Sequence, residues 1–110
     1  GQGGVMAGEL VVLITTKNLS EARRISRALV EEKLAACVNV VPTVESVFTW
    51  QGRMVREKEA LMVVKTRSAI FSRLEKKVKQ LHSYTVPEII ALPIKKGSRD
   101  YLAWVRQSTR

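Results

Sequence analysis

The sequence predicts an α+β domain of ferredoxin-like type, a β-α-β-β-α-β sandwich with a long β-hairpin and a short C-terminal helix. Three observations support this fold. Apolar runs of strand length alternate with amphipathic helical segments, and the two middle strands follow one another directly. Right-handed β-α-β crossovers around such a hairpin place both long helices on one face of the sheet. The length of 110 residues suits one domain.

The first strand and helix are predicted from their apolar spacing and from a cap. Residues 9–16, ELVVLITT, form a β-branched apolar run typical of a buried strand. Asn18 is a good N-cap, and Glu21 has the spacing that lets its carboxylate reach back to the cap amide. The apolar residues that follow recur at helical spacing, so the helix is predicted to end near Lys33.

A long hairpin is predicted next. Residues 36–50 have strand character that Pro42 interrupts, which requires a bulge, a bend or an edge position. Gln51-Gly52 is a plausible two-residue turn, because Gly tolerates positive φ. The chain then returns over residues 53–66.

This hairpin is too long for one compact domain. Fifteen extended residues span roughly 50 Å, whereas a compact chain of this size has a radius of gyration of about 13 Å. The overhanging part carries Phe48 and Trp50, and exposed apolar strands favour aggregation. We therefore expect other copies of the chain to cover it in a closed homo-oligomer; a mobile hairpin on a monomer is the alternative.

The second half of the chain is predicted to form a helix, a strand and a short last helix. Ser68 is predicted to cap a helix whose apolar stripe ends at Leu81, and residues 82–85 form a loop. Residues 86–94 read as the fourth strand, with prolines near both ends. Ser98 is predicted to cap the last helix.

The composition also bears on the domain bounds, the location and the partners of the protein. Residues 1–8 are glycine-rich and are expected to be a flexible extension of a domain that covers residues 9–110. No apolar run reaches the roughly 18 residues of a membrane helix, so we expect a cytoplasmic protein without a membrane partner. The net charge of +9 favours anionic partners or a solvated surface, and the spread of basic residues favours the solvated surface.

Several residue groups, in this order and spacing, resemble the CutA family of divalent-cation tolerance proteins over residues 10–106. The groups are Cys37-Val-Asn39, Ser46-x-Phe48-x-Trp50-x-Gly52, Glu59 with Lys65-Thr66, His82-x-Tyr84-x-x-Pro87-Glu88, and Gly97-Ser98 followed by Tyr101-Leu102 and Trp104. The resemblance implies a ferredoxin-like homotrimer, with hairpins that cross subunit boundaries, and a role in tolerance of copper and other divalent cations. Ser83 and Thr85 depart from it, because the family usually has proline and often glutamate there. We expect these changes to leave the loop less stiff and to remove a possible oxygen ligand.

Cys37 and His82 are the candidate metal ligands. Thiolate and imidazole together suit copper or zinc, but one chain offers one of each, without CxxC or HxxxH spacing. A complete site would need acidic residues or neighbouring subunits. The alternative is structural, with Cys37 a small buried apolar side chain and His82 closing a helix. No cofactor is expected to be obligatory.

The same residues bear on three other functions: an enzyme, a nucleic-acid-binding protein and a regulatory trimer. A Cys-His enzyme is not expected, because nucleophile elbow, phosphate loop and carboxylate pair are all missing from the sequence. Specific nucleic-acid binding is not expected, since residues 59–66 lack the aromatic residues that stack bases. A regulatory trimer that binds a small anion or a protein partner between subunits is the second reading. Its expected cleft residues are Lys65, Arg67, Tyr84 and Glu88, near His82, and Phe48, Trp50 and Trp104 are expected in hairpin and trimer packing.

Overall fold

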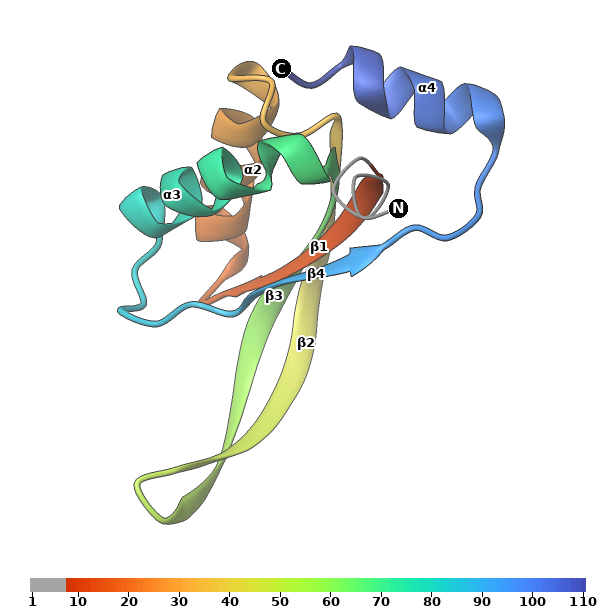
Figure 1. The fold of residues 1–110 in the computed structure, drawn as a ribbon. Helices are drawn as coiled ribbons and strands as arrows, with labels where there is room; N and C mark the ends of the chain where they lie inside the picture. The colour runs from red at the N-terminus through yellow and green to blue at the C-terminus, as the bar shows by residue number, and fades with distance from the viewer. Residues whose placement is uncertain (1–7) are drawn as a thin grey trace.

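A computed structural model of the protein describes residues 8–110 and confirms the predicted α+β ferredoxin-like sandwich. Four antiparallel strands form one sheet in the order β2-β3-β1-β4, and α2 and α3 lie on the same side of it (Figure 1). The elements are β1 Glu9–Thr16, α2 Leu19–Glu31, β2 Cys37–Trp50, β3 Arg53–Arg67, the 3-10 turn η1 Ser68–Ile70, α3 Phe71–Leu81, β4 Ile89–Pro93 and α4 Arg99–Gln107.

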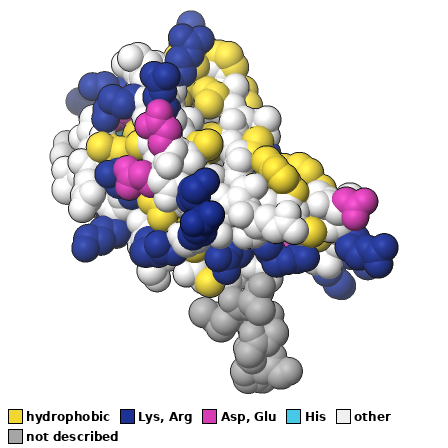
Figure 2. Space-filling view, turned by 90° about the horizontal axis from the view of Figure 1, so that it is seen from above, with side chains coloured by type: hydrophobic (Ala, Val, Ile, Leu, Met, Phe, Trp, Pro, Cys, Tyr) yellow, Lys and Arg dark blue, Asp and Glu magenta, His cyan; other side chains and the backbone are white. Residues whose placement is uncertain are grey.

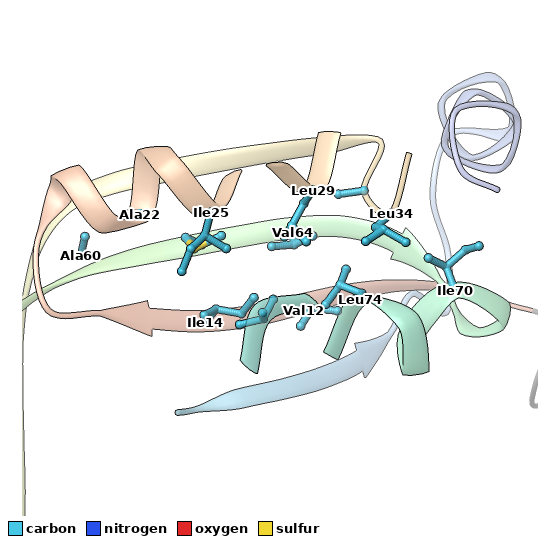
Figure 3. Close-up of a cluster of buried hydrophobic side chains, with 13 residues drawn as sticks. Val12, Ile14, Ala22, Ile25, Leu29, Leu34, Ala60, Val64, Ile70 and Leu74 are labelled. Carbon is cyan, nitrogen blue, oxygen red and sulfur yellow. The ribbon is translucent and has the colours of Figure 1, made fainter. Parts of the chain in front are cut away.

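The hydrophobic core fills the space between the sheet and the two long helices (Figure 3). Alternate residues of β1 point toward the helices, so Val12 and Ile14 are fully buried. Residues one helical turn apart, Ile25 and Leu29, cover them from α2. The buried cluster consists of Val12, Ile14, Ala22, Ile25, Leu29, Leu34, Ala35, Ala60, Met62, Val64, Ile70, Leu74 and Val78.

The hairpin extends beyond the rest of the sheet, as predicted (Figure 1). β1 pairs with β3 only along residues 60–67 of β3, so residues 53–59 have only β2 as a neighbour. We call this two-stranded part, residues 44–59, the ribbon. Its turn residues Gln51 and Gly52 have φ values of 53° and 78°, which fits a two-residue hairpin turn. The ribbon raises the radius of gyration to 14.7 Å, above the roughly 13 Å of a compact chain.

A β-bulge separates the ribbon from the main sheet. Val41 pairs with Leu61, whereas Val44 pairs with Glu59, so β2 uses one more residue than β3 between these two pairs. Pro42 lies in this bulge, where a missing backbone N–H breaks no regular ladder. The predicted interruption of the strand is therefore a bulge within one continuous β2.

α2 ends at Glu31, near the predicted Lys33, whose φ of 59° lies in the left-handed region that ends a helix. The predicted start of the second helix was wrong. Ser68 does not cap the second helix. It opens η1, and Ile70 precedes α3 without any side-chain cap.

The fourth strand is shorter than predicted, covering Ile89–Pro93 instead of residues 86–94. β4 pairs only with residues 10–14 of β1, so residues 86–88 have no strand beside them. Val86 is accordingly exposed. Ser98 does cap α4 as predicted, since its hydroxyl accepts the Tyr101 N–H.

The predicted extension of residues 1–8 lies outside the described residues except for Gly8. The Gly8 carbonyl accepts a hydrogen bond from the Ser68 N–H at 2.9 Å. Within residues 8–110, no helix is long and apolar enough to cross a membrane.

Glu21 ties the start of α2 to the loop after α3. Asn18 caps α2 as predicted, because its side chain accepts the Glu21 N–H at 2.8 Å. The Glu21 carboxylate does not reach back to the Asn18 amide. It accepts the N–H of Lys17 at 3.1 Å and the N–H of Ser83 at 2.7 Å. A proline at position 83 has no N–H, so Ser83 adds a tether to the loop that we expected it to loosen.

These contacts set the ionisation of Glu21. Burial alone would raise its pKa, but hydrogen bonds from the Ser83 side chain and from the Lys17 and Ser83 amides outweigh it, and the nearby His82 adds to them. The pKa of Glu21 is therefore lowered from its ordinary value of 4.5. A carboxylate with a lowered folded-state pKa stabilises the fold above its unfolded pKa, and this contribution is lost as the pH falls through the folded-state value.

We expect Ser83→Pro to raise the pKa of Glu21, because it removes both Ser83 donors. Ser83→Ala keeps the backbone N–H and should produce a smaller rise. Carbon-13 NMR titration of the Glu21 carboxyl measures both values. At neutral pH the Pro variant should also lose about 1–3 kcal/mol from this network, and the loss should shrink as the pH falls below 4.5. The stiffness of proline does not depend on pH, so an unchanged Glu21 pKa would contradict the assigned network.

Candidate functional site

A cavity of about 880 Å³ lies between the ribbon and the segment that follows α3. Its volume falls within the range of small-molecule sites, roughly 300–1,000 Å³. The ribbon, the end of β1 and residues 84–88 form its walls. The lining residues are Thr15, Ser46, Val47, Phe48, Trp50, Glu59, Tyr84, Thr85, Val86 and Glu88.

Tyr84 is held in this cavity from two sides. Its hydroxyl donates to the Glu59 carboxylate at 2.7 Å, and its ring centroid lies 4.9 Å from that of His82, at an interplanar angle of 50°. Burial raises the pKa of Tyr84, and the hydrogen bond and charge of Glu59 raise it further. The phenol therefore stays protonated and keeps donating to Glu59 at neutral pH.

His82 is buried beneath Tyr84, with both ring nitrogens engaged. Nε2 lies 2.7 Å from the Thr15 carbonyl, which can only accept, so we assign the ring proton to Nε2. Nδ1 accepts the Tyr84 N–H at 3.0 Å. Both ring nitrogens therefore help to position the loop, with Nε2 as the donor and Nδ1 as the acceptor. A metal ion at either nitrogen would have to displace one of these hydrogen bonds.

Cys37 lies away from His82. It is a half-buried free thiol at the start of β2 and pairs with Lys65 of β3. His82 instead contacts Thr15, whose partner on β3 is Leu61. Four residues along a strand correspond to about 13 Å, so one chain does not bring the two candidate ligands together. Residues 8–110 contain no group of three or more His, Cys, Asp or Glu side chains arranged to hold a metal ion.

Tyr101 of α4 is the neighbour that Cys37 does have. Burial raises the pKa of Tyr101, and the charge and hydrogen bond of the Cys37 sulfur add to the rise. The contact therefore connects the start of β2 to α4. It does not make the thiol part of a group of three His, Cys, Asp or Glu side chains, because residues 8–110 contain no such group.

The predicted anion cleft is divided in the same way. Tyr84 and Glu88 line the cavity. Lys65 is hydrogen-bonded to Asn39, and Arg67 donates to the Thr109 hydroxyl at 2.9 Å and to its carbonyl at 3.0 Å. Lys65 is six residues beyond Glu59 on β3, or about 20 Å along the strand. Within one chain, the two cations therefore lie away from Tyr84 and Glu88.

The three aromatic residues expected in subunit packing are partly exposed in the single chain. Phe48 and Trp50 project from the ribbon into the wall of the cavity, and Trp50 is 63% exposed. Trp104 lies on α4, with its ring centroid 5.5 Å from that of Tyr101. The cavity and α4 therefore each present aromatic surface.

Glu59 is a site residue that sequence reasoning did not assign. Strand alternation contains the signal, because residues 59, 61, 63 and 65 of β3 point away from the helices while residues 60, 62 and 64 are buried. The sequence does not give the register of β2 against β3, which is needed to place Glu59 beside the ribbon aromatics. Only the bulge at Pro42 places Val44 opposite Glu59 and brings the ribbon aromatics to the same face.

The chain is similar to known proteins over nearly its whole length. A family profile described as CutA1 divalent ion tolerance protein matches residues 10–108. The divalent-cation tolerance protein CutA of Thermus thermophilus is 54% identical over 101 residues, which are 92% of this chain and 98% of that protein. A rice protein named Protein CutA 1, chloroplastic, is 46% identical over 101 residues, and there the chain spans 57% of the relative's length.

Solved structures agree with the sequence matches. The Thermus thermophilus structure has a TM-score of 0.91 at 54% identity and covers 93% of this chain and 99% of its own. Rice CutA1 has a TM-score of 0.92 at 44% identity, with 96% of each chain covered. An Archaeoglobus fulgidus structure, described as a periplasmic divalent cation tolerance protein CutA, has a TM-score of 0.88 at 42% identity and covers 91% and 97%. The chain therefore belongs to the CutA1 divalent ion tolerance family.

Proposed function

We propose that the protein acts in divalent-cation tolerance as a homotrimer whose subunits meet across the helix-free face of the sheet and along the ribbon. The role in cation tolerance follows from the family. The main support for this assembly is a sheet face that is apolar and has no helix on it. The trimeric state is the one that the resemblance to the family implies.

The helix-free face is apolar where a solvated face would be polar. Strand alternation turns Val11 and Leu13 of β1 away from the helices, and their partners on β4 are Leu92 and Ile90. Ile90 is 50% exposed and Leu92 is 49% exposed. An antiparallel sheet with one wet face normally alternates apolar and polar residues. Here both faces are apolar, so the uncovered face fits a contact between subunits.

The ribbon supports the same assembly. Val47, Phe48, Trp50 and Met54 are all exposed on a two-stranded element that projects beyond the sheet (Figure 1). A pair of strands without further cover is marginal in water. A neighbouring subunit would bury these side chains and stabilise the ribbon.

We propose a cytoplasmic, non-enzymatic role. A single cysteine suits a reducing compartment, while the names of the relatives point to several compartments, chloroplastic in rice and periplasmic in Archaeoglobus fulgidus. For catalysis by a Cys-His pair, Cys37 would have to meet His82, and within one chain the strand register separates them.

Copper or another divalent cation is the proposed ligand of the assembly, with Cys37 and His82 as the candidate ligands. Cys37 lies on the helix-free face, because its partner Lys65 has the same strand parity as Val63 and Leu61. Subunits that meet across this face would bring further ligands to the thiol, since residues 8–110 of one chain contain no group of three His, Cys, Asp or Glu side chains that could hold a metal ion. Binding through His82 would require it to release the Thr15 carbonyl or the Tyr84 N–H.

The assembly is tested by placing a charge on each side of the sheet. We expect Ile90→Glu to reduce the mass in solution from trimer to monomer, because a carboxylate on the helix-free face would be buried between subunits. Val30→Glu is the matched control, since Val30 is 43% exposed on the helix side. Light scattering measures the mass, and circular dichroism checks the fold. A monomeric wild type, or an Ile90→Glu trimer as stable as wild type, would count against the assembly.

Copper titration by calorimetry tests the metal proposal. We expect Cys37→Ser to weaken copper binding at least tenfold, because it replaces the only thiolate with a harder oxygen ligand. His82→Ala should weaken it as well if the imidazole leaves its hydrogen bonds to join the site. Binding that is unchanged in both variants would show that Cys37 and His82 are structural.

A further inference from the structure

We propose that the outer surface of α2 and α3, which we call the helix layer, binds the phosphate backbone of double-stranded nucleic acid without reading its sequence. The helix layer lies on the side of the sheet away from the proposed subunit contacts (Figure 1). The assembly therefore leaves it accessible. Its charge, its ion pairs and its lack of exposed aromatic side chains each bear on the nature of the partner.

The positive charge of the chain is unevenly distributed over the fold. α2 and α3 together carry seven Lys and Arg against three Glu, and one of these three, Glu21, is buried. The ribbon, in contrast, has three Lys and Arg and three Glu. Figure 2 looks onto the end of the molecule opposite the ribbon, where Lys and Arg side chains cover much of the surface. Basic residues gathered along helices on one face are typical of a surface that attracts nucleic acid.

Two shallow hollows adjoin along the exposed side of α3. The first, of about 270 Å³, lies between α3 and the end of α2 and is lined by Glu32, Leu34, Arg73, Lys76, Lys77 and Gln80. The second, of about 430 Å³, is lined by Ser72, Glu75, Lys76, Lys79 and Gln80. Lys76 and Gln80 belong to both linings. The exposed side of α3 therefore presents a hollowed polar surface with four cations and two carboxylates.

Both carboxylates of these hollows are already paired. The pairs are Lys77–Glu32 at 2.9 Å and Lys79–Glu75 at 3.3 Å. Within residues 8–110, Arg73 and Lys76 make no ion pair, and both side chains are exposed. They lie about one helical turn, or 5.4 Å, apart. Two neighbouring cations of α3 are therefore available to phosphate oxygens.

α2 adds a third available cation. Arg27 pairs with Glu31 at 3.3 Å, but the two side chains are 80% and 66% exposed. A surface ion pair of this kind is worth little. A guanidinium group binds phosphate with two parallel hydrogen bonds, so Arg27 can exchange Glu31 for a phosphate at small cost.

The helix layer suits a duplex better than a single strand or a membrane. Proteins hold single strands largely by stacking bases on aromatic side chains, and Phe71, the one aromatic residue of α2 and α3, packs against the core. Stable membrane binding needs an apolar or lipid anchor besides basic charge, and Val30 is the only exposed large hydrophobic residue of these helices. A duplex presents dense phosphates, and contacts to phosphates carry no sequence information.

The probe is a fluorescein-labelled DNA duplex about two helical turns long, compared with an RNA duplex and a DNA single strand of matching sequence. Fluorescence anisotropy measures binding. We expect micromolar dissociation constants at about 50 mM salt and a slope of log K against log salt of about −3, as for three neutralised phosphates. Arg73→Gln combined with Lys76→Gln should weaken binding at least tenfold and make the slope shallower by about two. Both residues are exposed, so circular dichroism should show an unchanged fold.

Lys95→Gln combined with Lys96→Gln is the matched control, because it removes the same charge from the loop between β4 and α4, outside the helix layer. Equal losses in the control and the α3 variant would overturn the proposal, since binding would then follow net charge alone. Failure of both duplexes to bind at about 50 mM salt, or tighter binding of the single strand, would also overturn it. Vesicles of phosphatidylcholine and phosphatidylserine test the membrane: vesicle binding without duplex binding would replace the nucleic acid by a lipid surface.

Light scattering on the same samples separates this inference from the proposed assembly. A trimer that binds neither duplex would overturn the nucleic-acid surface alone. A monomer that binds a duplex, with the expected loss in the α3 variant and not in the control, would overturn the assembly alone.

Discussion

The length mismatch between β3 and β1 governs this structure. β3 has 15 residues and β1 has eight. β3 therefore lies between two strands only along residues 60–67, about half of its length. The remainder of β3 pairs with β2 alone and forms the ribbon. The aromatic residues of the ribbon are exposed, and form one wall of the cavity, because β2 and β3 continue to pair beyond the hydrophobic core.

The fold was largely predictable because its signals are local and periodic. Alternation in β1, the stripe of α2, the Asn18 cap and the Gln51-Gly52 turn each follow from a few neighbouring residues. The errors fall where a distant partner decides. Residues 86–88 look like strand, but β1 offers them no neighbour. Ser68 looks like a cap, but the chain makes the 3-10 turn η1 over Ser68–Ile70 before α3 begins.

The site was less predictable, because it depends on register rather than on composition. Cys37 and His82 have suitable chemistry for a soft metal, yet the pairing of β2 with β3 and of β1 with β3 puts them at different heights along the sheet. Tyr84 and Glu88 were assigned to an anion cleft because they are near Lys65 in the topology. The register separates them from Lys65 and gives Tyr84 the carboxylate of Glu59 as its partner.

The single extra residue at Pro42 determines which side of the molecule the aromatic residues belong to. Before the bulge, Cys37, Asn39 and Val41 share the helix-free face; after it, the parity reverses and Val44, Phe48 and Trp50 take that side. Pairing of the same residues without the bulge would shift the ribbon part of β2 by one position against β3 and would turn Val44, Phe48 and Trp50 to the helix side. Changes of register at this point within β2 should therefore be tolerated far less than changes at the Gln51-Gly52 turn between β2 and β3.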